Sequence, residues 1–185
     1  YYFSERRVSK KNMLFSIDSN TYRAKSDGSL CMNEWYKDAD GTYYYYDENG
    51  HNIKNKVQKI GDSYYGFDSN GKMYADTAFY NADKKYYAKA DGTFAKNEWI
   101  TTSDGKTYYF DGIYKVRGIQ TIDGKEYLFD EDGAYICEES KLNYGWNWIN
   151  SGYYYRTENG IANGRQRING KEYQFDHGKM PVSYT

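Results

Sequence analysis

Short runs of aromatic residues alternate with polar turns along the whole chain. Runs such as Tyr43–Tyr46 and Tyr64–Phe67 are each followed by an acidic residue and then by a glycine. Asn-Gly and Asp-Gly pairs between such runs are strong signals for β-hairpins, because glycine and asparagine tolerate positive φ. No stretch shows the 3.6-residue apolar period of an amphipathic helix. The pattern predicts an all-β chain of seven complete hairpins, with partial units at the ends.

The aromatic runs recur at a nearly fixed interval. The glycines that close them are Gly28, Gly50, Gly71, Gly92, Gly112, Gly133, Gly160 and Gly178, most often 21 residues apart. Such a period is typical of solenoids and arrays, in which each unit buries its apolar face only against its neighbours. One enlarged unit occupies about residues 134–160. Because Tyr1–Phe3 resembles the strand of an earlier unit, residues 1–185 are interpreted as a single repeat array cut from a longer protein.

A slower period overlies the first one. The tripeptide Asn33-Glu34-Trp35 returns as Asn97-Glu98-Trp99, 64 residues or three units later. This spacing predicts a β-solenoid in which about three hairpins complete one superhelical turn, with both tryptophans on the same face. A solenoid of short hairpins offers grooves rather than a closed, water-excluding pocket. An extended binding surface is therefore favoured over an active site.

The composition indicates a thin, aromatic core. The chain contains only 27 leucine, isoleucine, valine and phenylalanine residues but 25 tyrosines, so tyrosine supplies much of the apolar area. The 25 basic and 26 acidic residues are finely mixed, without the basic stripe of a nucleic-acid-binding protein. No apolar run approaches the roughly 18 residues of a membrane span. We therefore expect neither a nucleic-acid partner nor a membrane span.

The residues that could carry chemistry fit turns better than catalytic or metal sites. The acidic turns Asp38–Gly41 and Asp130–Gly133 lack the ligand register of a calcium loop, and turn chemistry accounts for their aspartates and glycines. His51 and His177 also lie in turns, without a nucleophile motif beside them. We expect no catalytic residue, no metal site and no cofactor. The fragment is not predicted to be an enzyme, although a longer parent protein could carry a catalytic domain.

The segment Gly118–Asp130 resembles a known repeat, Gly-Trp-x-x-x-(Asp/Asn)-Gly-x-x-Tyr-Tyr-Phe. That repeat occurs in choline-binding and cell-wall-binding proteins of Gram-positive bacteria. Related repeats occur in glucan-binding domains of glucansucrases and receptor-binding domains of large clostridial toxins. The resemblance extends over essentially the whole chain. It implies a β-solenoid of hairpins in a secreted or cell-surface protein, with cell-wall polysaccharide, glucan, a host glycan or choline as partner.

The chain departs from the choline-binding pattern at the aromatic positions. Choline sites in this family resemble cages built from two tryptophans and an aromatic residue of the next repeat, in which the cation lies against several ring faces. The Gly-Trp dipeptide occurs here only as Gly145-Trp146. The aromatic runs begin with Thr42, Ser63, Lys85, Thr107 or Glu126, never with tryptophan. These departures favour the glucan-binding and toxin-type branch, in which sugars stack on tyrosine and tryptophan.

Four tryptophans and four tyrosines are the candidate ligand-binding residues. Trp35 and Trp99 are each expected to form a stacking platform, or else to pack between successive hairpins. Trp146 and Trp148, two positions apart in the enlarged unit, would face the same side of a strand and either line a pocket or plug an irregular joint. The complete candidate set is Trp35, Tyr43, Tyr64, Trp99, Tyr108, Tyr127, Trp146 and Trp148.

Three functions are consistent with these residues. The first is a non-catalytic module that binds cell wall or carbohydrate through several weak aromatic sites summed by multivalency. The second is a structural stalk or protein-interaction scaffold, and the third is a module that binds choline on teichoic acid. Tryptophan exposure separates the first two, because a stalk should bury every tryptophan.

Overall fold

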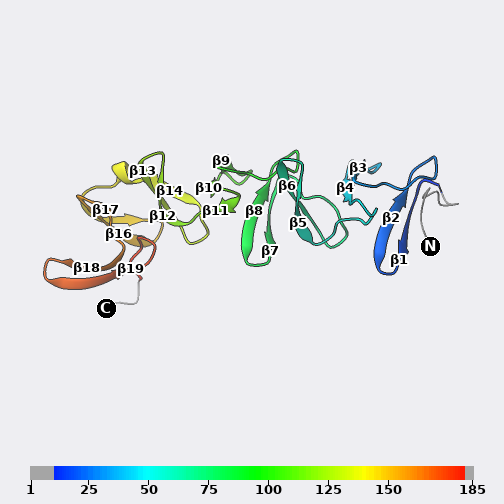
Figure 1. Ribbon diagram of the computed structural model, residues 1–185. Helices are drawn as coiled ribbons and strands as arrows, with labels where there is room; N and C mark the ends of the chain where they lie inside the picture. The colour runs from blue at the N-terminus through cyan, green and yellow to red at the C-terminus, as the bar shows by residue number, and fades with distance from the viewer. Residues whose placement is uncertain (1–10, 182–185) are drawn as a thin grey trace. The chain divides into compact units, whose positions relative to one another are not determined.

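The computed structural model describes residues 11–181, and their regular secondary structure is almost entirely β (Figure 1). The only helical segment within this range is the short 3-10 helix η1 (Glu139–Lys141). The family of hairpins predicted from the sequence is confirmed, but the described residues contain eight hairpins rather than seven. The additional hairpin joins β1 (Met13–Ile17) to β2 (Asn20–Ala24). The expected strand at Tyr1–Phe3 lies outside the described residues.

The chain divides into two compact units, one ending at Phe94 and the other beginning at Ala95. The remaining hairpins of the first unit are β3 (Glu34–Lys37) with β4 (Tyr43–Tyr46), β5 (Lys56–Ile60) with β6 (Ser63–Phe67), and β7 (Thr77–Asn81) with β8 (Lys84–Ala88). A single array across both units, with about three hairpins per superhelical turn, stays a prediction.

The second unit contains the longer sheets. Three of its hairpins carry a third strand: β9 (Glu98–Thr101), β10 (Thr107–Asp111) and β11 (Tyr114–Lys115); β12 (Gly118–Ile122), β13 (Lys125–Phe129) and β14 (Tyr135–Glu138); β15 (Gly145–Ile149), β16 (Gly152–Thr157) and β17 (Gly160–Ile161). The last hairpin joins β18 (Gly164–Ile168) to β19 (Lys171–Phe175).

Tight turns of one kind close several hairpins. Asp123 and Gly124 connect β12 to β13 with φ values of 50° and 76°, and Asn169 and Gly170 connect β18 to β19 with 49° and 82°. Two consecutive positive φ values define the type I′ turn, whose twist matches that of the flanking strands. Asp123-Gly124 and Asn169-Gly170 therefore form hairpin turns of the kind that the sequence predicts.

The acidic residue that follows most of the aromatic runs organises the next turn. The Asp47 carboxylate accepts hydrogen bonds from the backbone N–H groups of Asn49, at 2.9 Å, and His51, at 2.8 Å. Asp68 makes the equivalent bonds to the N–H groups of Asn70 and Lys72, both at 2.8 Å. Aspartate favours such turns because its side chain satisfies backbone donors that no strand partner reaches.

Backbone hydrogen bonds connect successive hairpins within each unit. In the first unit, the Met73 N–H donates to the Tyr43 carbonyl at 2.9 Å, and the Phe94 N–H donates to the Tyr64 carbonyl at 3.1 Å. In the second unit, the Met180 N–H reaches the Tyr153 carbonyl at 2.8 Å. Each returning segment thus links its own hairpin to the preceding one, and the seams between hairpins are where side chains from two repeats meet.

The extra residues of the enlarged unit lie between β14 and β15. Helix η1 starts this insertion, and the side chain of Leu142 is buried directly after it. Arg156 on β16 holds the insertion through an ion pair with Glu139 and a 2.6 Å hydrogen bond to the Leu142 carbonyl. Its guanidinium also lies 4.5 Å from the centre of the Tyr144 ring. The insertion is therefore anchored to the hairpin that carries Trp146.

Candidate aromatic binding clusters

Trp35 is the centre of the first aromatic cluster. Its ring lies 5.1 Å from that of Tyr45, its cross-strand partner on β4, and 4.7 Å from that of Tyr65 on the next hairpin. The two tyrosine rings are inclined to the indole by 66° and 67°. Phe67 closes the inner side at 5.9 Å, and Tyr43 lies at the outer edge at 6.5 Å. The cluster therefore combines residues of two successive hairpins.

Trp99 is the centre of the second cluster, which repeats this arrangement. Its cross-strand partner Tyr109 lies at 5.1 Å, and Tyr127 of the next hairpin lies at 5.2 Å. Phe129 stacks on the indole at 5.6 Å with an interplanar angle of 24°. Tyr135 on β14 meets the indole edge-on at 5.6 Å and supplies the outer edge.

Trp146 is the centre of the third cluster. Its cross-strand partner Tyr155 lies at 5.1 Å, and Tyr173 of the following hairpin lies at 5.0 Å. Phe175 lies at 5.9 Å on the inner side, and Tyr153 at 6.2 Å on the outer edge. Three tryptophans thus share a cross-strand tyrosine, a tyrosine of the next hairpin and an inner phenylalanine, although their sequence spacing is irregular. The outer-edge tyrosine lies on the tryptophan's own hairpin in the first and third clusters and on β14 in the second.

Each of these tryptophans has one packed side and one side open to solvent. Phe67, Phe129 and Phe175 are at most 2 % exposed, so each anchors its indole to the core of its unit. Trp99 and Trp146 nevertheless remain 39 % and 40 % exposed, and Trp35 is partly buried. One tryptophan side chain can therefore both pack between hairpins and present a stacking platform, the two roles expected from the sequence.

The third cluster carries an additional platform. Trp148 is 58 % exposed, and its ring lies 4.4 Å from that of Tyr153, its cross-strand partner. Because Trp146 also contacts Tyr153, both tryptophans of β15 face the same side, as their two-residue spacing predicts. The register equivalents of Trp148 are Lys37 in the first cluster and Thr101 in the second. The aromatic surface of the third cluster is consequently the most extensive.

The candidate tyrosines are only partly gathered around the tryptophans. Tyr127 contacts Trp99, and Tyr43 lies at the edge of the first cluster. Tyr64 instead stacks near Phe94 at 6.4 Å, and Tyr108 lies beneath the Lys115 ammonium group at 4.7 Å.

The neighbouring positions, not Tyr64 and Tyr108, complete the first two clusters. Tyr65 and Tyr109 are each one residue further along the strand, and a shift by one residue moves a side chain to the other face of a hairpin. Tyr45 was likewise not identified from the sequence. Strand register was the missing information, and it depends on the length of each hairpin turn.

Three tyrosines of the clusters have raised pKa values. Burial raises the pKa of Tyr45, with the Asp47 carboxylate adding to the effect, and burial also raises the pKa of Tyr109 and Tyr135. The Tyr45 hydroxyl donates a 2.6 Å hydrogen bond to the Asn33 side-chain oxygen. The clusters therefore present neutral aromatic faces together with hydroxyl groups that can donate and accept hydrogen bonds.

The chemistry of these clusters is that of recognition of a ring or an organic cation. Three steeply inclined aromatic faces can stack on the apolar face of a sugar or surround a quaternary ammonium group. Across residues 11–181, no group of three His, Cys, Asp or Glu side chains is arranged to hold a metal ion. The same residues include no helix long and apolar enough to cross a membrane.

Comparison with protein families matches two segments of the chain. Residues 33–51 and 97–112 each match the model of a cell wall binding repeat of the choline-binding type. Both matching segments begin with the Asn-Glu-Trp tripeptide that contains Trp35 or Trp99. The family match thus covers the first halves of two of the aromatic clusters.

A curated relative extends the similarity to most of the sequence. The chain is 32 % identical over 174 residues to glucosyltransferase-S of Streptococcus mutans, an alignment that covers 83 % of this chain and 12 % of the relative. The chain therefore spans about an eighth of the length of that protein.

Solved structures with similar folds come from Streptococcus pneumoniae. CbpJ has a TM-score of 0.58 and 22 % sequence identity. The alignment covers 90 % of this chain and 57 % of CbpJ. Choline binding protein F, solved with a peptidoglycan analogue, gives 0.54 at 24 % identity, covering 89 % of this chain and 57 % of that one. The choline-binding domain of CbpL has a TM-score of 0.51 and 20 % identity, and the alignment covers 96 % of this chain and 100 % of that domain. At these identities the similarity concerns the fold.

Proposed function

The chain carries repeats of the cell wall binding family, and from this premise we propose that it is a non-catalytic module that binds polysaccharide through its three aromatic clusters. The observation that carries the proposal is the recurrence of one arrangement around Trp35, Trp99 and Trp146. Each indole is fixed on its inner side by a buried phenylalanine and flanked by tyrosines from two hairpins. A rigid, partly exposed aromatic face of this kind suits the apolar face of a sugar ring.

The partner class follows from the surface of the clusters and from the relationship to a glucosyltransferase. Tyrosine hydroxyls next to the indoles supply hydrogen-bond partners for sugar hydroxyls, as a neutral glycan requires. Several equivalent weak sites on one chain favour a polymer over a small ligand, because linked sites raise the effective concentration of the next one. An α-glucan or a cell-wall polysaccharide has the required repetition, and such a module would act outside the cell or at the bacterial surface.

The exposure of the tryptophans supports a binding role over a purely structural stalk. A stalk gains stability by burying large apolar side chains, at about 25 cal/mol per Å². Trp99, Trp146 and Trp148 retain 39 %, 40 % and 58 % of their surface in solvent. Leaving three tryptophans so exposed is costly for a stalk and useful for a binding surface.

Choline is the second candidate ligand, and a specific feature favours it. Trp146 has two tyrosine rings, Tyr155 and Tyr173, inclined to it by 70° and 69°. Aromatic faces that converge at such angles can contact a quaternary ammonium group from several sides at once. The same cluster also contains the only Gly-Trp dipeptide of the chain, Gly145-Trp146.

Tryptophan fluorescence and calorimetric titration would test both ligands on the whole chain. Dextran, isomaltose oligosaccharides, choline and purified Gram-positive cell walls are the probes, and the variants are Trp35→Ala, Trp99→Ala and Trp146→Ala, singly and together. Tyr80→Ala is the matched control, because Tyr80 is 66 % exposed and lies outside the clusters. Polysaccharide binding that falls with each tryptophan lost supports the proposal. Binding retained by a folded triple variant would reject it, and saturable binding of choline alone would select the second candidate.

A further inference from the structure

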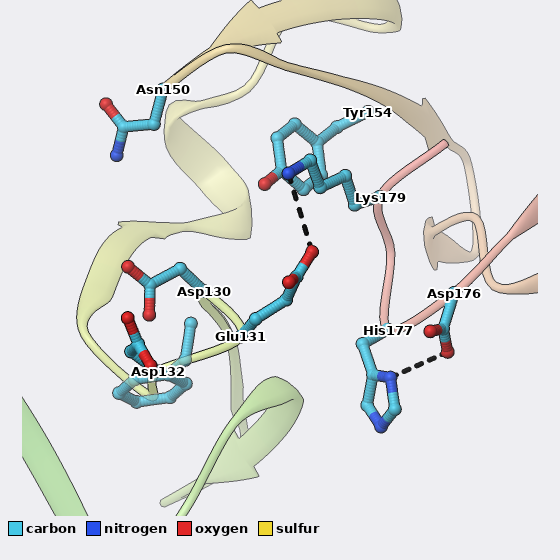
Figure 2. Close-up of a pocket in the computed structure, with 9 residues that line it drawn as sticks. Asp130, Glu131, Asp132, Asn150, Tyr154, Asp176, His177 and Lys179 are labelled. Carbon is cyan, nitrogen blue, oxygen red and sulfur yellow. Dashed lines mark ion pairs between the residues drawn. The ribbon is translucent and has the colours of Figure 1, made fainter. Parts of the chain in front are cut away.

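The second unit contains a polar cavity that shares one lining residue, Phe129, with the second aromatic cluster. Figure 2 shows it between the turn after β13, the β15–β16 hairpin and the turn after β19. Its volume is about 220 Å³, below the range of about 300–1,000 Å³ that is usual for drug-sized ligands. The cavity therefore has room for one small polar unit.

The position of Tyr154 separates this cavity from the third cluster. Tyr153 and Tyr155 contact Trp146, whereas Tyr154 lies between them on β16 and points to the opposite face of the hairpin. The ring of Tyr154 packs in an apolar group with Leu128, and its hydroxyl end lines the cavity. A ligand in the cavity would thus leave the aromatic face of β16 free.

The Tyr154 hydroxyl is the solvent-reaching end of an otherwise buried side chain, and it has no protein partner among the described residues. The side chain is 3 % exposed, and within residues 11–181 its hydroxyl makes no hydrogen bond. In Figure 2 the hydroxyl is directed toward the side of the cavity where Asn150 and Asp130 lie. A polar ligand or ordered water in the cavity would satisfy it.

The other side chains give the cavity an excess of negative charge. Four carboxylates line it, those of Asp130, Glu131, Asp132 and Asp176. Glu131 pairs with Lys179 at 3.5 Å, and Asp176 lies 2.7 Å from the His177 ring nitrogen (Figure 2). Lys115 adds a positive charge nearby, because its ammonium group donates a hydrogen bond to the backbone carbonyl of Asp132.

Two carboxylates are left to attract a cation. Asp130 uses one oxygen to accept a 2.7 Å hydrogen bond from the Ala134 N–H. Within the described part of the chain, neither Asp130 nor Asp132 forms an ion pair, and no three of the acidic or histidine side chains converge on a metal position. The cation that suits this cavity is therefore an organic ammonium group rather than a metal ion.

We propose that the cavity binds one amino sugar unit of a glycan, with its ammonium group between Asp130 and Asp132 and a ring hydroxyl on the Tyr154 oxygen. A primary ammonium group supplies three donors for carboxylates, and the sugar hydroxyls match the phenol and the Asn150 amide. Burial, reinforced by the Asp130 carboxylate, raises the pKa of Tyr154 to about 12. Its hydroxyl therefore stays protonated and available as a donor at neutral pH.

Calorimetric titration of the whole chain at low salt tests this site with three probes. A glucosamine tetramer carries both ammonium and hydroxyl groups, its N-acetylated counterpart lacks the charge, and propylamine lacks the sugar. The glucosamine tetramer should bind at least about tenfold more tightly than either of the others, since hydrogen bonds to charged groups contribute about 1.5–3 kcal/mol. Equal affinity for the N-acetylated tetramer, or for propylamine, would overturn the proposal.

Two substitutions then locate the site. Tyr154→Phe keeps the packed ring and removes only the hydroxyl, and it should weaken tetramer binding roughly three- to tenfold. Asp132→Asn changes an exposed turn residue, so it provides a second variant if Tyr154→Phe fails to fold. Tyr46→Phe is the matched control, because Tyr46 is similarly buried, at 1 % exposed, but belongs to the first unit and does not line this cavity. Dextran binding should be unchanged in every variant, which separates this site from the aromatic clusters. Unaltered tetramer binding by Tyr154→Phe and Asp132→Asn would refute the assignment.

Discussion

The rings of Trp146 and Tyr173 lie 5.0 Å apart, although the two residues belong to successive hairpins. The same relationship joins Trp35 to Tyr65 at 4.7 Å and Trp99 to Tyr127 at 5.2 Å. A contact of this kind has two consequences, because it stabilises the seam between hairpins and it forms one wall of a candidate site. Substitutions that separate these two roles are therefore informative.

Tyr173→Phe should separate packing from recognition in the third cluster. The ring contact with Trp146 is kept, so the free energy of unfolding should change by less than about 0.5 kcal/mol, as for an ordinary surface substitution. The lost hydroxyl should weaken sugar binding about two- to tenfold, from a hydrogen bond of about 0.5–1.5 kcal/mol. Tyr173→Ala is the comparison, and it should lower both stability and binding. Urea unfolding and titration with dextran measure the two effects. Unchanged sugar affinity in Tyr173→Phe would show that its hydroxyl does not contact the ligand.

The sequence was sufficient for the hairpins but not for the composition of the clusters. Asp-Gly and Asn-Gly turns, with the aspartate that follows most aromatic runs, determine where the strands begin and end through local backbone preferences. The partner of Trp35 depends instead on register across a longer turn and on the way the next hairpin packs. Tyr64 and Tyr65 are indistinguishable by residue type, yet only Tyr65 contacts the indole.

The cavity beside Tyr154 was also beyond reach of the sequence. Asp130, Asp132 and His177 were interpreted as turn residues, and the structure does place the Asp130 carboxylate in a turn. What brings two turns and the β15–β16 hairpin around one space is the packing of hairpins that are distant in sequence. The long interval between Gly133 and Gly160 indicated an enlarged unit, but it did not indicate that η1 and Arg156 hold the extra residues.

Lys37→Trp should extend the first cluster toward the form of the third. Lys37 pairs across the strands with Tyr43 as Trp148 pairs with Tyr153. An aromatic pair contributes about 0.5–1.5 kcal/mol beyond burial, so a comparable gain on a sugar would raise affinity about two- to tenfold. The gain should be measured by fluorescence titration with dextran in a chain that also carries Trp99→Ala and Trp146→Ala. Lys59→Trp, on the exposed face of β5, is the control. An equal gain from the control would mean that the position opposite Tyr43 is not special.

Alkaline pH should destabilise the first unit through Tyr87. The Tyr87 hydroxyl donates a 2.7 Å hydrogen bond to Asp76. Burial, with that hydrogen bond adding to it, raises the pKa of Tyr87 to about 12, against an ordinary value of about 10. Since the folded pKa is the higher one, the stabilisation is complete below about pH 10 and is lost as the pH rises toward about 12.

Urea unfolding between pH 8 and pH 12 checks this effect by comparing the parent chain with Tyr87→Phe. The parent should be the more stable at pH 8, and its advantage should shrink by about 1–3 kcal/mol toward pH 12, because one pKa unit corresponds to about 1.4 kcal/mol. Tyr80→Phe, at an exposed position on the same hairpin, should run parallel to the parent. A constant difference between the parent and Tyr87→Phe across this range would contradict the raised pKa.

Gly133→Ala should destabilise the second unit far more than Gly124→Ala, although both glycines close turns around β13. Their φ values are similar, 80° and 76°, so the backbone strain of an added side chain is about the same, roughly 1–2 kcal/mol. A Cβ atom at Gly124 would meet no heavy atom within 4 Å, whereas one at Gly133 would collide with the backbone carbonyl of Val116. The difference between the two variants therefore isolates the close approach of the turn to the neighbouring segment.

Thermal and urea unfolding of the two glycine variants measure this difference directly. We expect Gly133→Ala to lose at least about 1 kcal/mol more than Gly124→Ala, in the range typical of overpacking. Gly133→Ala should also weaken dextran binding at the second cluster. Phe129 stacks on Trp99, and it is the last residue of the strand that leads into this turn. Equal losses in the two variants would mean that the turn can move away from Val116. In that case the glycine is required only for its positive φ, and the packing of this turn does not hold Phe129 under the indole.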